Sequence, residues 1–220
     1  MKINLTIIIL AIVVACNAQS KEKQATVVKS EEITKNLADG KSVQIKNAVI
    51  EGSLIFDKAS TVNANVYFEK CIFKGSIKAE DVRFNGNVIF LESEFQEKVE
   101  FHNNSIFGMV NFSRSVFKSD AIFANMAVWA KNSYFSGIKA SKKFSLEASD
   151  FHGNLTLIRS EFSDAFSLQE TFVLGSLQAA DIKFDGSTDF AMLEVLRRAI
   201  FTHSTFKNTP DFSSSKIVKE

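Results

Sequence analysis

The chain has little of several residue types on which chemical sites depend. Its 220 residues include one proline, one tryptophan, two cysteines and three histidines, and its 26 basic residues nearly balance its 25 acidic ones. This balance excludes the strongly basic surface typical of nucleic-acid binding and also the strong acidity of a protein that mimics DNA. The nine glycines are spread singly along the sequence, so it contains no Gly-rich phosphate loop.

The residues that could catalyse a reaction or bind a metal are scattered. The three histidines are His102, His152 and His203, and no pair of them has the spacing of metal ligands. Asp150, Glu161 and Asp164 surround His152 in sequence, but nothing beside this group supplies a nucleophile or an oxyanion site. We therefore expect no catalytic residue, no metal site and no cofactor.

Residues 1–15 have the features of a signal peptide. Lys2 is followed by an apolar stretch that is too short to span a bilayer and that ends in Val13-Val14-Ala15-Cys16. This ending resembles the lipobox of bacterial lipoproteins, and the resemblance implies cleavage before Cys16 and a lipid on its thiol. An ordinary secretory signal with an incidental cysteine is the alternative.

The resemblance also bears on location and charge. Asn17 follows the cysteine, which in the lipoproteins it resembles favours the outer membrane, so we expect a lipid-anchored protein of the bacterial cell envelope. Processing would remove Lys2 and no acidic residue, which leaves 25 basic and 25 acidic residues. With Cys16 lipidated, Cys71 would be a lone thiol, and its position in the repeat predicts a buried, unreactive side chain.

The segment before the repeat divides into a tether and a cap. Residues 16–29 lack periodicity, which predicts a lipidated, flexible tether. Residues 30–42 are expected to form a cap helix, with Ser30 as its N-cap and with Ile33 and Leu37 on one face. The helix would cover the open strand edges and apolar end of the first coil, although more tether is an alternative.

The 22 phenylalanines follow an 11-residue repeat from Val43 to Glu220. Sixteen units fit, with one extra residue between 54 and 65 and another between 121 and 132. Positions 1, 3, 6 and 8 of the unit are apolar or small, and 20 of the 22 phenylalanines occupy positions 1, 3 and 8. Seven glycines occupy position 10, which indicates a corner that needs a positive φ or a close backbone approach.

This spacing predicts two short strands in each unit and excludes simple helices. Inward residues alternate by two, jump by three and alternate again, as two pleated edges joined by a corner would require. Two units would close a four-sided coil of 22 residues. Residues at the same position in successive coils should then stack, as in the ladders Phe68–Phe90–Phe112–Phe135 and Phe73–Phe95–Phe117.

The pairs Ser93-x-Phe95 and Ser160-x-Phe162, which follow Phe90 and Leu157 by five residues, resemble those of pentapeptide-repeat proteins. The resemblance covers residues 43–220 and implies an all-β fold, a right-handed quadrilateral parallel β-helix. This sequence differs in that alternate pentapeptides carry a sixth residue. Some members of that family pair through an end of the solenoid, so the resemblance also implies that a homodimer could form through the C-terminal coil.

Position 9 supplies the candidate binding residues. Phe107, Trp129 and His152 occupy it in units that are two apart, so they would stack in an outward aromatic ladder that binds a partner or a sugar. Alternatively, a one-residue bulge turns Phe107 and Trp129 inward in place of Ile106 and Val128.

These observations predict a non-enzymatic envelope scaffold or interaction module. Its partners would be membrane lipid through Cys16 and an unknown envelope protein or polysaccharide, with no nucleic acid. A polysaccharide-active enzyme on a β-helix is the alternative, but the repeat has no long insertion to build the walls of a groove. An inhibitor that mimics DNA would need an acidic surface, which a chain of balanced charge lacks.

Overall fold

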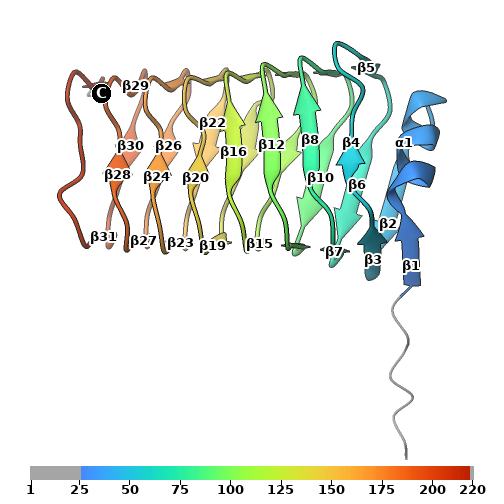
Figure 1. Cartoon of the computed structure of the whole chain (residues 1–220). Helices are drawn as coiled ribbons and strands as arrows, with labels where there is room; N and C mark the ends of the chain where they lie inside the picture. The colour runs from blue at the N-terminus through green and yellow to red at the C-terminus, as the bar shows by residue number, and fades with distance from the viewer. Residues whose placement is uncertain (1–25, 219–220) are drawn as a thin grey trace, which may run out of the picture.

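The computed structural model describes residues 26–218, which form an all-β parallel solenoid with one short helix. Its strands belong to four parallel sheets of nine, eight, seven and eight strands, which we call sheets A, B, C and D and which form the four sides of the coil. Figure 1 shows a right-handed winding, because the strands of the front sheet (β8, β12, β16) point upward, the upper edge follows, and the chain advances from right to left. The predicted quadrilateral β-helix is therefore confirmed.

Sheets A and B lie next to each other along the coil. Sheet A comprises β1 (Thr26–Lys29), β3 (Ala48–Glu51), β7 (Ile72–Phe73), β11 (Glu94–Phe95), β15 (Val116–Phe117), β19 (Lys139–Ala140), β23 (Glu161–Phe162), β27 (Lys183–Phe184) and β31 (Thr205–Phe206). Sheet B comprises β2 (Val43–Lys46), β6 (Val66–Glu69), β10 (Val88–Leu91), β14 (Val110–Asn111), β18 (Asn132–Tyr134), β22 (Asn154–Thr156), β26 (Leu177–Gln178) and β30 (Ala199–Ile200).

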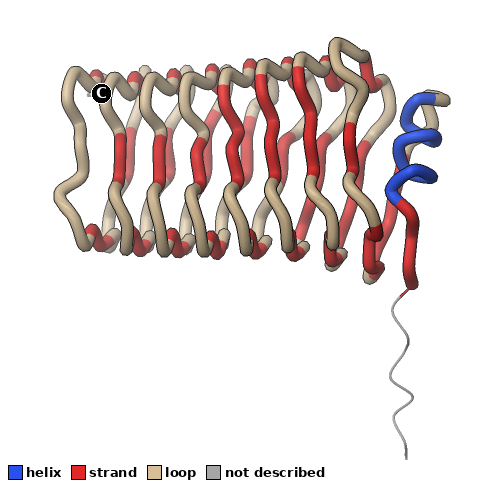
Figure 2. Tube along the Cα trace, viewed as in Figure 1, coloured by secondary structure: helices blue, strands red, loops and turns tan. Residues whose placement is uncertain are grey.

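Sheets C and D complete the coil before the chain returns to sheet B. Sheet C comprises β4 (Leu54–Ile55), β8 (Ile77–Glu80), β12 (Val99–His102), β16 (Ala121–Ala124), β20 (Phe144–Ser145), β24 (Phe166–Ser167) and β28 (Thr188–Asp189). Sheet D comprises β5 (Thr61–Val62), β9 (Arg83–Phe84), β13 (Ser105–Ile106), β17 (Ala127–Val128), β21 (Asp150–Phe151), β25 (Phe172–Val173), β29 (Glu194–Val195) and β32 (Lys216–Ile217). The strands alternate with short corners, as Figure 2 shows.

The strand register confirms the 22-residue coil and both extra residues. Val66 pairs with Val88, 22 residues later. The first extra residue lies in the corner between β4 and β5, because Ile55 pairs with Lys78 but Thr61 pairs with Arg83. The second lies between β17 and β18, because Val128 pairs with Phe151 but Asn132 pairs with Asn154. Each insertion is absorbed at a corner, so the core residues keep their inward direction.

The N-terminal end carries a cap that differs from the prediction in two respects. Residues 26–29, expected in the tether, form β1, which pairs with β3 and adds a ninth strand to sheet A. Helix α1 (Ser30–Ala38) follows directly, with Ile33 and Leu37 buried as predicted. Ser30 is not the N-cap: it is the buried first residue of the helix, and Lys29 at the cap position makes no side-chain capping hydrogen bond.

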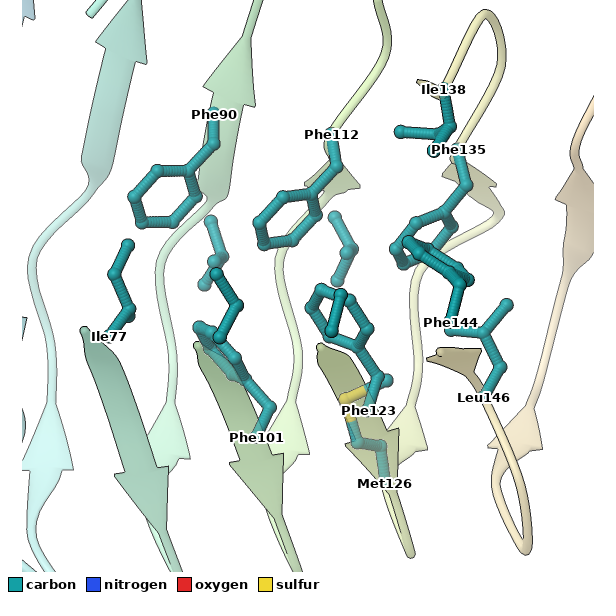
Figure 3. Close-up of a cluster of buried hydrophobic side chains, with 14 of the residues drawn as sticks. Ile77, Phe90, Phe101, Phe112, Phe123, Met126, Phe135, Ile138, Phe144 and Leu146 are labelled. Atoms are coloured by element: carbon teal, nitrogen blue, oxygen red, sulfur yellow. The ribbon is translucent and has the colours of Figure 1, made fainter. Parts of the chain in front are cut away.

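The core consists of phenylalanine ladders along the solenoid axis. Phe90 stacks on Phe68 and Phe112 with ring centroids 5.1 and 5.0 Å apart, and Phe135 extends the same row. Figure 3 shows this row facing a second one that includes Phe123. Rings in neighbouring rows meet edge to face, as Phe112 and Phe123 do at 4.9 Å, a geometry that aromatic pairs favour. The predicted ladders are therefore confirmed.

The corners are built from left-handed residues at position 5 of every unit. Gly137 and fifteen residues other than glycine have a φ of about +50° to +60° or slightly more there: Asn47, Ala59, Lys70, Asp81, Glu92, Asn103, Arg114, Asn125, Ala148, Arg159, Glu170, Asp181, Met192, His203 and Ser214. Such a conformation costs roughly 1–2 kcal/mol for a residue with a Cβ. The stacked ladder holds it in place, as when the Lys70 N–H donates to the Leu91 carbonyl of the next coil.

The glycines at position 10 are needed mainly for close packing of successive coils. Only Gly52 among them has a positive φ. A Cβ on Gly75 would lie 2.5 Å from the carbonyl oxygen of Gly52 in the preceding coil, too close for any side chain. Of the two explanations that the sequence left open, close backbone approach therefore accounts for most of these positions.

Small polar residues at position 6 complete the hydrogen bonding of the core. The Ser115 hydroxyl donates to the Phe90 carbonyl at 2.8 Å and accepts from the Ser93 N–H at 3.1 Å. The Ser93 hydroxyl in turn accepts from the Cys71 N–H at 3.2 Å. These hydroxyls satisfy backbone groups beside the left-handed corner, where an unpaired buried polar group would be costly.

Candidate functional site

Sheet D presents the three predicted binding residues at its outer edge. Ile106 and Val128 are buried, whereas Phe107 and Trp129 are 40% and 51% exposed, so the inward bulge is wrong and the side chains form an outward ladder. Phe107 and Trp129 lie parallel with ring centroids 6.0 Å apart, and the His152 ring lies 3.8 Å from that of Trp129. Regular strand pairing beneath them, through β13, β17 and β21, fixes this stack.

The ladder exposes the edges of its rings more than their faces. The guanidinium of Arg83 lies 4.3 Å from the centre of the Phe107 ring, and Trp129 covers the opposite side. Trp129 is itself between Phe107 and His152. A sugar usually stacks on a free ring face, and these faces are already occupied. The geometry therefore suits an apolar surface better than a polysaccharide.

The ladder also extends beyond the residues that the sequence pointed to. Strand register places Leu174, Leu196 and Val218 at the same outward position in the three coils after His152. Leu174 and Val218 are exposed, and Leu196 is partly exposed. The sequence analysis selected this position by its aromatic residues. It therefore missed the aliphatic side chains that continue the row to the C-terminal end.

The adjoining face, on sheet B, is free of charge over most of its length. From β10 to β26 its outward residues are Ile89, Leu91, Asn111, Ser113, Tyr134, Ser136, Thr156, Ile158, Gln178 and Ala180. We call these ten side chains the uncharged face. The outward residues of sheet C include Lys78, Glu100 and Glu147, so the absence of charge is a property of one side of the solenoid. Sequence reasoning missed this face because its members are separated by 22 residues.

The corner that joins sheet D to sheet B carries only positive charges. We call the residues at positions 9 to 11 there, from Asn63 to Arg198, the aromatic corner. Its charged members are Lys131, Arg197 and Arg198, and Lys131 lies at the insertion that directly follows Trp129. β29 runs through residues 191–199, so this segment continues the coil without a helical turn, and both arginines are exposed.

The acidic residues near His152 in sequence do not form a site. Asp150 lies on β21 of sheet D beside His152, whereas Glu161 lies on β23 of sheet A and Asp164 follows that strand. Sheets A and D form opposite sides of the coil. Among residues 26–218, no group of three His, Cys, Asp or Glu residues is placed to hold a metal ion.

Cys71 is a core residue, as predicted. Its thiol is buried at position 6, with Sγ 3.5 Å from the Glu69 carbonyl oxygen and 3.6 Å from that of Ile45. Burial raises the pKa of the Cys71 thiol above its ordinary value, which leaves little reactive thiolate at neutral pH. Cys16, the predicted lipidation site, lies outside the described residues.

The described surface has shallow depressions and no deep cleft. One depression of about 240 Å³ lies between α1 and the corner with the first insertion, and its walls include Leu37, Phe56 and Ser60. It contains no histidine and no cysteine, and Asp57 is its one charged residue. The depression offers no pair of groups that could transfer a proton.

No family model, curated protein or solved structure matched the chain. Within residues 26–218, α1 is the single helix, and it is too short and too polar to cross a membrane.

Proposed function

We propose that the chain is a non-enzymatic lipoprotein of the bacterial cell envelope, with the outer membrane favoured. Its pentapeptide-repeat-like solenoid would act as a rigid scaffold that a lipid on Cys16 holds at a membrane. The outward ladder of Phe107, Trp129 and His152 would be its contact surface. This ladder carries the proposal, because large aromatic side chains exposed at one regular position are unusual without a partner.

The covered ring faces favour one kind of partner over another. An envelope protein or another apolar surface can pack against ring edges and the neighbouring leucines, whereas a polysaccharide needs free ring faces. The alternative of a polysaccharide-active enzyme has less support, because Asp150 and Glu161 lie on opposite sides of the coil. The alternative of a DNA-mimicking inhibitor has the least support, because the exposed charges of the aromatic corner are positive.

Site-specific photo-crosslinking in intact bacterial cells tests this proposal. A photoreactive residue at Met109, in the aromatic corner, should form crosslinks to a partner, either a protein or a lipid, and a probe at Lys118, on the diagonally opposite corner of the same coil, should not. Cys16→Ser should release the protein from the membrane fraction. Equal labelling at both positions, or membrane recovery that does not depend on Cys16, would contradict the proposal.

A homodimer through the C-terminal coil is a second proposed contact. Phe212, Ile217 and Val218 are exposed on this last coil, and Phe206 and Phe201 are only partly buried beneath it. A second copy could cover these side chains end to end. Phe212→Lys with Ile217→Lys should then shift the sedimentation of the purified protein from dimer to monomer. A wild-type chain that sediments as a monomer would exclude this contact.

A further inference from the structure

The interfacial aromatic residues of the chain gather on one side of the solenoid. Trp129 is the only tryptophan, and Tyr67 and Tyr134 are the only tyrosines. Tyr67 and Tyr134 point outward from sheet B, and Trp129 lies at the edge of the same side. Tryptophan and tyrosine favour the boundary between water and lipid, because their rings are apolar and carry a polar group.

The charges of the aromatic corner have one sign, whereas the other edge of the uncharged face, where sheet B turns into sheet A, pairs Glu92 with Lys70 and Arg114. In the aromatic corner Lys131, Arg197 and Arg198 are basic and no residue is acidic. The diagonally opposite corner, from sheet A to sheet C, mixes signs, with Lys118 and Asp120 in the same turn. The aromatic corner, which has exposed apolar side chains and no acidic residue, is therefore the part of this side that is complementary to a membrane with anionic lipids.

The chain enters the solenoid next to this side. Thr26, the first described residue, pairs with Ala48, which follows the corner where sheet B ends at Lys46. Thr26 lies ten residue steps after Cys16, a stretch that can span up to about 35 Å when extended. A lipid on Cys16 could therefore insert in a bilayer that touches the uncharged face.

We propose that the uncharged face and the aromatic corner lie flat against an anionic lipid bilayer, with the solenoid axis parallel to the membrane. Phe107, Met109, Trp129 and Leu174 would enter the headgroup boundary along one long edge. Lys131, Arg197 and Arg198 would contact anionic headgroups. This inference rests on the proposed lipid anchor and names the bilayer itself as the partner of the ladder.

Fluorescence of the single tryptophan tests the orientation directly. The full-length lipidated protein would be reconstituted into vesicles of phosphatidylethanolamine and phosphatidylglycerol, with and without bromine on the acyl chains. Trp129 should shift its emission to the blue, lose most of its intensity in brominated vesicles and become shielded from acrylamide. Emission that stays unquenched by bromine and accessible to acrylamide would overturn the proposal.

A relocated tryptophan supplies the matched control. In Trp129→Phe with Lys118→Trp, the probe sits at position 9 of the opposite corner in the same coil, and it should remain unquenched by bromine. Circular dichroism would verify that this variant keeps its β-sheet signal. Equal quenching at both positions would mean no preferred orientation and would also overturn the proposal.

Charge reversal separates docking from anchoring. Arg197→Glu with Arg198→Glu should lower the ratio of docked to undocked solenoids, by about fivefold for each charge removed, while the protein still floats with the vesicles. Loss of flotation with the wild-type chain would instead mean that the lipid anchor has failed. Trp129 that is shielded from acrylamide in the unlipidated Cys16→Ser protein, in buffer without vesicles or detergent, would point to a second copy or a protein on this face, and would contradict the proposal.

Discussion

The two ends of the solenoid differ in how their apolar cross-section is covered. At the N-terminal end, β1 pairs with β3 and α1 closes the first coil, so Ile33 and Leu37 are buried. At the C-terminal end, nothing within the described residues follows β32, and Phe212 and Ile217 are 37% and 43% exposed. Because each coil packs only on its neighbours, the described solenoid has a covered first coil and a last coil whose apolar side chains stay partly exposed.

A cavity in the middle of the phenylalanine ladder should have the largest effect on stability. Phe112 stacks on Phe90 and Phe135 and is buried. We expect Phe112→Ala to lower the free energy of unfolding by about 3–5 kcal/mol, because it removes a ring from the continuous ladder. Urea denaturation followed by circular dichroism measures the loss. Phe107→Ala is the matched control, and a similar loss there would show that the outward ladder supports the fold.

Truncations at the two ends should sharpen the contrast between them. Ile33→Ala creates a cavity under the cap and should cost about 2–4 kcal/mol. Phe212→Ala removes a ring that is partly exposed and encloses no cavity, so about 1–2 kcal/mol is expected. Hydrogen exchange would locate the change, with faster exchange in the first coil for the former variant and in the last coil for the latter. Equal effects on both coils would contradict the view that coupling is local.

Two glycine substitutions should compare the close packing between coils with the open space after the cap helix. Gly75→Ala would force a Cβ against Gly52 in the preceding coil, and we expect a loss of about 1–3 kcal/mol. Gly40, after α1, has a φ of +74° but nothing within 4 Å of an added Cβ. Gly40→Ala should therefore cost only about 1 kcal/mol, from the backbone conformation alone. Thermal unfolding compares the pair, and a reversed order would argue against close coil packing.

The smallest effects should come from one carboxylate near each end. The ammonium of Lys46 and the hydroxyl of Tyr67 hold the pKa of Glu69 below its ordinary value. The Ser213 N–H similarly lowers the pKa of Asp211. A carboxylate with a lowered pKa stabilises the fold above its unfolded pKa, and this contribution is lost as the pH falls through the folded pKa.

Substitution and salt should tell these two carboxylates apart. Glu69→Gln should slightly lower the urea midpoint at neutral pH, and the difference from wild type should vanish in acid and shrink in about 1 M salt, where the ion pair is screened. Asp211→Asn keeps an acceptor oxygen for Ser213, so its midpoint should change less. A salt-independent loss for Glu69→Gln would contradict an electrostatic origin.

Much of the fold could be predicted from the sequence because inward positions repeat so strictly. The ladders and both insertions followed from the spacing of residues such as Phe90 and Phe112. The left-handed corners could not be predicted, because Gly137 is the one glycine among them and residues such as Lys70 or Glu92 give no sign of a positive φ. β1 escaped notice because a single strand outside the repeat has no period of its own.

The contact surface could be predicted only in part. At Ile106-Phe107 and at Val128-Trp129 two apolar residues adjoin, so the pattern does not decide which one faces the core. The decision comes from the register with Phe84 below and Phe151 above, which is a tertiary constraint. The uncharged face likewise depends on residues that meet only after the coil closes.

The register of about 22 residues has a consequence for how the chain acquires its shape. Every chain is synthesised from its N-terminus, so β1 and α1 emerge first and each later coil needs only the coil before it as a template. The solenoid can then fold during synthesis, one coil at a time, starting from its N-terminal end. Among the described residues, the strands of the last coil are the ones whose outer edges have no partner, so they would be the last to gain a protected backbone.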